Sequence, residues 1–194
     1  MARTKRTVLA ALALMGAASV VAATPAAAAG ASTPSTQTAC STGWGSSDKT
    51  GTATTTASLT NVRTGTHDCY DRMVVDAPGA GAGLGYSVRY VDRLYQDGTG
   101  RPIAVGGGAV IEVRVGAPSY DPQTGSPTYP GRVAQPLPGV NLTGYPTFKD
   151  TRFAGSFEGD TQLGLGVRAR LPFRVQVLND RIVVDVAHNW TGAR

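Results

Sequence analysis

The stretch Phe173-Arg-Val-Gln-Val-Leu-Asn-Asp-Arg-Ile-Val-Val-Asp-Val186 decides the fold. In its first half, apolar residues alternate with Arg174 and Gln176, as in a strand that buries one face. Asn179-Asp180 is typical of a tight turn, and a run dominated by Val and Ile follows it. The stretch therefore predicts a β-hairpin.

Three other segments show strand patterns. Tyr70–Val75 is a short apolar run, and Tyr86–Asp92 and Val110–Val115 alternate in polarity. No window after residue 29 has a helical period, and 25 glycines and 12 prolines make up nearly a fifth of the 194 residues. We expect an all-β protein, either a two-layer β-sandwich or an open β-barrel-like domain, with one long proline-rich loop.

Residues 1–29 have the three parts of a secretory signal peptide. A basic start at Arg3–Arg6 precedes an apolar run from Val8 to Ala23, and Ala27-x-Ala29 offers a cleavage motif. The apolar run of 16 residues is shorter than the roughly 20 residues that a membrane helix needs. We expect cleavage, secretion and no stable membrane insertion afterwards, with an uncleaved anchor as the alternative.

The net charge of +5 comes mostly from this segment. Residues 1–29 hold three basic residues and no acidic one, so 15 basic residues face 13 acidic ones in the remaining chain. A net charge near +2 does not favour nucleic-acid binding, and no nucleic-acid partner is expected.

Residues 30–58 are mostly Ser, Thr, Ala and Gly, which predicts a flexible leader before a domain at residues 59–190. Export to an oxidising compartment favours a disulfide between Cys40 and Cys69, the two cysteines of the chain. A free thiol or a lipid anchor at Cys40 is the alternative. Trp44 and Cys40 suggest that part of the leader is pinned to the domain.

The proline-rich loop at residues 117–138 is one candidate for ligand contact. It carries Tyr120, Tyr129 and Arg132, although the same tyrosines could instead cover an edge of the sandwich. Arg168 and Arg170 are further candidates, because they share one face of an extended segment and arginine recognises phosphate and carboxylate groups. Salt bridges to acidic residues are the other interpretation of these arginines.

No catalytic or metal-binding residues are predicted, and no cofactor is expected. His67 and His188 lack a ligand cluster at metal-site spacing, and we interpret both as structural. Glu158 and Asp160 are separated by one residue, which is more typical of a solvated turn than of a glycosidase pair. Nucleophile-elbow, zinc-protease and phosphate-loop motifs are not found.

One hexapeptide occurs twice with a single difference. Asp71-Arg-Met-Val-Val-Asp76 returns as Asp180-Arg-Ile-Val-Val-Asp185. Within one extended copy the two ends lie too far apart to pair, about 13 Å at strand rise. The charged residues Asp71, Arg72, Asp76, Asp180, Arg181 and Asp185 are therefore expected to pair with neighbouring strands or to face solvent. The alternative to a duplication is that the two copies are themselves paired or pseudo-symmetric strands.

These two segments, with Pro172-Phe-Arg-Val175 before the second, resemble the AMIN-like domain of secreted actinobacterial proteins. Supporting motifs are Tyr90-Val-Asp92, Asp97-Gly-Thr-Gly100, Phe157-Glu-Gly159 and Gly164-Leu-Gly166. The resemblance covers roughly residues 59–188. The AMIN-like domain is distantly related to AMIN domains, which are small β-sandwiches of cell-wall amidases and secretin subunits. The resemblance implies a non-catalytic localisation module that contacts peptidoglycan.

Export and this resemblance together predict a secreted, non-enzymatic binding domain associated with the cell envelope. Its expected partner is peptidoglycan, another cell-wall polymer or an envelope protein. The alternative is a secreted protein–protein interaction or inhibitor domain that engages its partner through residues 117–138. The sequence leaves the oligomeric state and the binding face open.

Overall fold

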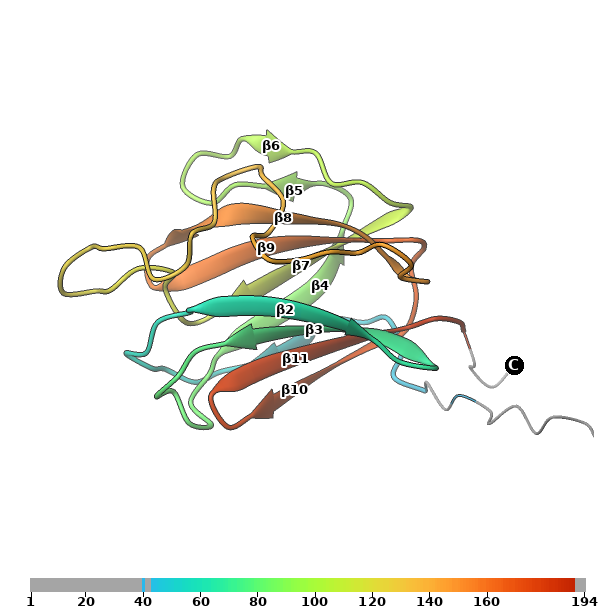
Figure 1. Cartoon of the computed structure of the whole chain (residues 1–194), viewed down its shortest axis with the longest axis horizontal. Helices are drawn as coiled ribbons and strands as arrows, with labels where there is room; N and C mark the ends of the chain where they lie inside the picture. The colour runs from blue at the N-terminus through green and yellow to red at the C-terminus, as the bar shows by residue number, and fades with distance from the viewer. Residues whose placement is uncertain (1–39, 41–42, 191–194) are drawn as a thin grey trace, which may run out of the picture. The chain divides into compact units, whose positions relative to one another are not determined.

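The computed structural model describes residue 40 and residues 43–190, and the expected hairpin forms strands β10 (Phe173–Leu178) and β11 (Arg181–Ala187) (Figure 1). The strands pair from Phe173 with Val186 to Leu178 with Arg181, which leaves a two-residue turn. Asp180 in this turn has a φ of 61°, a left-handed conformation that Asp tolerates better than most residues. The signal peptide expected at residues 1–29 lies outside the described residues.

The strands form two main antiparallel sheets (Figure 1). Sheet A has five strands in the order β1 (Lys49–Gly51), β4 (Tyr86–Val91), β7 (Ala109–Val115), β9 (Asp160–Val167) and β8 (Phe148–Phe157). Sheet B has four, in the order β10, β11, β3 (Tyr70–Asp76) and β2 (Asn61–Thr66). The all-β prediction is confirmed, and the architecture is a sandwich of two sheets.

One hydrophobic core is built from alternate residues of both sheets. Sheet B contributes Met73, Val75, Phe173, Ile182, Val184 and Val186, and sheet A contributes Val88, Ile111, Val113, Leu163, Leu165 and Phe148. Each such side chain stabilises the fold by about 1.5–3 kcal/mol when it leaves water. Because the side chains of a strand alternate, every second residue of these strands points to the opposite, outer face.

The outer faces of the two sheets differ. A small sheet of β5 (Leu94–Tyr95) and β6 (Pro102–Ile103) lies over sheet A, where Leu94 and Ile103 pack with Ala154 in a second apolar cluster. In the described part of the chain, no strand lies over the outer face of sheet B. Side chains rather than a strand cover that face, since Val74, Val183 and Asp185 on it are buried.

The segment before β2 is more ordered than the flexible leader expected at residues 30–58. β1 pairs with β4, and the backbone carbonyl of Gly45 accepts a hydrogen bond from the amide of Phe173. A disulfide joins Cys40 to Cys69, as expected. We call residues 43–51 the strap. Backbone pairing holds it in place, although its side chains bury little apolar surface.

The loop at residues 117–138 covers one edge of the core. Tyr129 is 3% exposed and its ring lies 6.0 Å from that of Phe153. Leu137 is also buried, and Tyr120 forms an isolated β-bridge with Pro127. Among the described residues, no helix is long and apolar enough to cross a membrane.

Candidate binding site on the outer face of sheet B

The repeated hexapeptide forms the two central strands of sheet B. β3 and β11 pair antiparallel, so that Arg72 lies opposite Asp185 and Asp76 lies opposite Arg181. Val74 pairs with Val183 midway between these two charged pairs. The repeat thus generates a local two-fold arrangement, as the hypothesis of paired or pseudo-symmetric strands anticipated.

The first charged pair becomes a row of three side chains, which we call row 1: Arg72, Asp185 and Arg174. The Asp185 carboxylate is fully buried, and its Oδ1 and Oδ2 accept from Nε and Nη2 of Arg72 at 2.7 and 2.9 Å. Nε of Arg174 donates to Oδ2 of Asp185 at 2.8 Å. Hydrogen bonding to Asp185 raises the pKa of Arg72, so this guanidinium is charged at any physiological pH. Two arginines and one carboxylate give row 1 a net charge of +1.

The second charged pair forms row 2: Arg63, Asp76 and Arg181. Nε and Nη2 of Arg63 donate to the Asp76 carboxylate at 2.9 and 3.1 Å. Nε of Arg181 lies 3.8 Å from Oδ1 of Asp76. The hydrogen bond to Asp76 raises the pKa of Arg63. Row 2 therefore repeats both the composition and the net charge of row 1.

Aromatic side chains gather at row 1. The guanidinium of Arg174 lies 4.5 Å from the ring centroid of Trp44, and that of Arg72 lies 5.2 Å from the centroid of Tyr70. Trp44 meets Tyr70 edge to face at 5.8 Å, and His67 stacks on the same tyrosine at 4.6 Å. Rings and guanidinium planes together form a platform that suits the faces of sugar rings and anionic groups.

The platform depends on the strap, because the strap carries Trp44. The disulfide fixes Cys40 next to the turn that holds Tyr70. Arg170 anchors the strap from the other side, since it donates to the backbone carbonyl and hydroxyl of Ser46 at 3.1 and 3.2 Å and lies over the ring of Tyr90. The site is thus assembled from sheet B and from a segment far from it in sequence.

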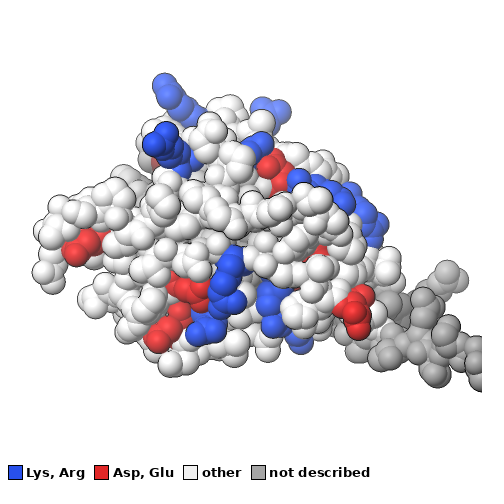
Figure 2. Space-filling view, in the orientation of Figure 1, with Lys and Arg blue, Asp and Glu red and all other residues white. Residues whose placement is uncertain are grey.

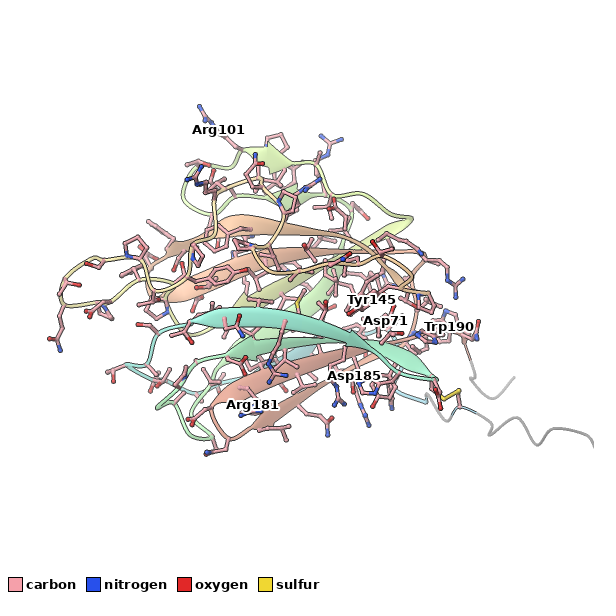
Figure 3. All side chains as sticks on the ribbon, in the orientation of Figure 1. Asp71, Arg101, Tyr145, Arg181, Asp185 and Trp190 are labelled. Atoms are coloured by element: carbon pink, nitrogen blue, oxygen red, sulfur yellow. A yellow bond between two sulfur atoms is a disulfide. The ribbon has the colours of Figure 1, made fainter. Side chains whose placement is uncertain are left out.

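A buried carboxylate supports the same end of the sheet from the core side. Asp71 accepts hydrogen bonds from the amides of Thr147 and Phe148 through Oδ2. Its Oδ1 accepts from the hydroxyl of Thr66 and lies 3.0 Å from Nε2 of His188. Asp71 therefore ties β2, β8 and the segment after β11 together. Figure 3 shows Asp71 inside the sandwich and Asp185 on the lower sheet.

The other predicted residues lie apart from the two rows. Arg168 hydrogen-bonds the carbonyl of His188, and Arg170 holds the strap, so both are structural neighbours of the platform. Asp180 accepts the amide of Gly81 at 2.6 Å in the hairpin turn. Arg132 is exposed on the loop at residues 117–138.

The two loop tyrosines have different surroundings. Burial raises the pKa of Tyr129 to about 12, and the side chain lies in the core, so we leave it out of any ligand site. Tyr120 is half-buried and lines an open cleft of about 580 Å³ with Thr55, Ser58, Pro118 and Pro122 among others. This cleft is separate from the rows of sheet B.

Sequence reasoning did not single out four members of the platform and rows: Trp44, Tyr70, Arg174 and Arg63. A signal was present, because Arg174 alternates with core residues in the predicted hairpin and must share a face with Asp185 across the turn. Trp44 carried a weaker signal, its closeness in sequence to Cys40. In the described part of the chain, no three His, Cys, Asp or Glu side chains are grouped in a way that could hold a metal ion.

The charges are visible on the surface of the molecule. Figure 2 shows blue and red atoms side by side over the lower part, where Figure 1 draws the strands of sheet B.

In comparisons with known proteins, a family model described as AMIN-like domain matches residues 57–188. No curated protein and no solved structure matched.

Proposed function

The chain belongs to the AMIN-like domain family, and from this premise we propose that it binds peptidoglycan or another cell-wall polymer through the outer face of sheet B. The family is one of cell-wall-related binding domains. The observation that carries the proposal is the aromatic platform at row 1, on a sheet face that no other strand covers. The signal peptide expected at residues 1–29 would deliver the domain to the wall.

The chemistry of the platform fits such a polymer. The partly exposed rings of Trp44 and Tyr70 offer apolar surface beside the guanidinium groups of row 1, which offer donors for carboxylates or phosphates. Arginine and tyrosine are the residue types that dominate binding energy at interfaces. The domain would act without catalysis, by holding itself, and anything attached to it, at the wall.

Co-sedimentation with purified sacculi tests the proposal. The variant Arg72→Gln/Arg174→Gln/Asp185→Asn removes row 1 without leaving a buried carboxylate unpaired, and it changes the net charge by one unit. We expect it to lose about tenfold or more of the binding, equivalent to about 1.4 kcal/mol.

The matched control is Arg101→Gln, which removes one positive charge at the opposite end of the molecule (Figure 3). It should bind like the unaltered protein. Failure of the unaltered protein to sediment with sacculi at moderate salt would overturn the proposal.

A second candidate function is protein binding through the cleft beside Tyr120. Its lining of two prolines, a tyrosine and hydroxyl groups suits a peptide more than a charged polymer. Tyr120→Ala should then abolish capture of an envelope protein while leaving sedimentation with sacculi unchanged.

A further inference from the structure

We propose that rows 1 and 2 together bind a phosphodiester-linked polymer of the cell wall, with one anionic group on each row. This inference rests on the proposed function and specifies which component of the wall sheet B recognises. It follows from three properties of the rows: their charge, their unused donors and their spacing.

Charge is the first property. Each row joins two arginines to a single carboxylate, so each keeps one uncompensated positive charge. A phosphodiester carries one negative charge per repeating unit, so one repeat neutralises one row.

Unused donors are the second property. Arg174 donates to Asp185 through Nε and has no other hydrogen-bond partner among the described residues, so four N–H groups on Nη1 and Nη2 remain. Arg72 and Arg63 engage their carboxylates through Nε and Nη2, which leaves Nη1. The hydrogen bonds of Arg181 use Nε alone. Both rows can therefore bind an added anion without breaking their own ion pairs.

The geometry of these donors favours phosphate over carboxylate. Arg72 and Arg174 reach Asp185 from its two neighbouring strands, so their free donors flank it. The two unesterified oxygens of a tetrahedral phosphodiester diverge more widely than those of a planar carboxylate, and they can reach both guanidinium groups at once. All four cations are arginines, the residue type that best matches phosphate oxygens with paired donors.

Spacing is the third property. Arg72 and Asp76 are four residues apart on the same face of β3, which separates the rows by about 13 Å. The uncharged pair Val74 and Val183 lies between them. A small anion can occupy one row only, whereas a linear polymer can occupy both, and the second contact then forms at high effective concentration.

Glycerol-phosphate oligomers of two lengths test this arrangement by titration calorimetry. One is a dimer too short to reach from row to row, and the other is long enough to do so. We expect the long oligomer to bind at least about tenfold more tightly per molecule. Equal affinity of the two lengths would overturn the proposal.

A variant of row 2 isolates the second contact. Arg63→Gln/Asp76→Asn/Arg181→Gln should reduce the affinity for the long oligomer to that of the dimer and leave the affinity for the dimer unchanged at row 1. Arg101→Gln, with the same loss of one charge, should retain the length dependence. If the triple variant does not fold, Arg181→Gln alone keeps Asp76 paired with Arg63 and should still weaken the advantage of the long oligomer.

Sacculi before and after acid extraction of phosphodiester polymers separate this inference from the proposed function. We expect extraction to remove most of the binding. Undiminished binding to extracted sacculi would overturn the phosphodiester inference and leave wall binding in place. Absence of binding to both preparations would overturn the proposed function itself, and equally tight binding of a thymidine oligonucleotide of matched length would overturn the assignment to the wall.

Discussion

Asp71 and Asp180 begin the two copies of the repeated hexapeptide but have different roles in the structure. Asp71 is fully buried and accepts hydrogen bonds from the backbone amides of Thr147 and Phe148 and from the hydroxyl of Thr66. Asp180 sits in a turn with positive φ and accepts one amide. The sequence of the hexapeptide predicted that charged residues would flank a buried strand. Which partner each carboxylate binds is determined by the surrounding elements.

Residue-scale prediction succeeded where chemistry alone decides, and it failed where packing decides. The Cys40–Cys69 disulfide was predicted from the expected export and from the number of cysteines, and it is present. The exposure of Tyr129 depended on how the loop folds over Phe153, and nothing in the local sequence specifies that contact. Arg168 and Arg170 likewise make structural contacts, with His188 and Ser46, that nothing in the local sequence specifies.

Tyr129 makes the stability of the protein sensitive to alkali. Burial raises its pKa from near 10 to about 12, so between these values the unfolded chain loses a proton that the folded protein keeps. The stabilisation is complete below about pH 10 and is lost as the pH rises through about 12. Tyr129→Phe removes this contribution, so the free energy of unfolding of the variant should fall less as the pH rises. The loss of stability in the two proteins should differ by a total of about 2–3 kcal/mol.

Denaturant unfolding at about pH 8 and about pH 11 measures the first half of this difference, about 1.4 kcal/mol. The half-buried Tyr90, whose pKa burial also raises, is present in both proteins and does not affect the comparison. Identical losses of stability in the two proteins would show that Tyr129 ionises as freely in the folded state as in the unfolded chain.

At the scale of elements, strands with regular alternation were predicted well. The hairpin β10–β11 and the strands β3, β4 and β7 all lie where the polarity pattern placed them. The long hairpin β8–β9 was not predicted, because β8 carries charged residues on its outer face and β9 contains Gly164 and Gly166. At Gly164 an added Cβ would meet Leu94, so the covering β5 explains a glycine that weakens the local strand signal.

The strap is the element that the sequence described least well. Its composition resembles that of a flexible segment, yet it pairs with β4 and delivers Trp44 to row 1. The interactions that order it are backbone hydrogen bonds, the disulfide, the contacts of Arg170 with Ser46 and the packing of Trp44, and they leave no repeating pattern of apolar residues. Composition therefore underestimates how much of this region is structured.

Removal of the disulfide should affect stability and binding together. Cys40→Ser/Cys69→Ser frees a loop with a sequence separation of 29 residues and should lower the free energy of unfolding by about 3–4 kcal/mol. Because the disulfide anchors the start of the strap, sedimentation with sacculi should also weaken at temperatures where the protein remains folded. Wild-type protein treated with reductant is the control and should match the variant. Binding that survives both treatments unchanged would show that Trp44 is not part of the site or does not need the disulfide.

At the scale of the whole molecule, the two sheets have different outer surfaces. Sheet A is covered in part by β5 and β6, and sheet B displays two arginine–carboxylate rows. The sequence predicted the fold class and the family, because both rest on strand patterns and motifs. It could not predict the binding face, because the rows arise from pairing between β3 and β11, whose partners are more than a hundred residues apart.

Mapping of backbone and tryptophan NMR signals during titration with muramidase-solubilised sacculi fragments tests most directly whether sheet B is the binding face. We predict that the largest shifts belong to Trp44, Tyr70, Arg72 and Arg174, followed by the residues of row 2, while the cleft beside Tyr120 and the region of Arg101 remain unchanged. Shifts centred on the cleft with none on sheet B, or no shifts at saturating fragment, would contradict the assignment of wall binding to this face.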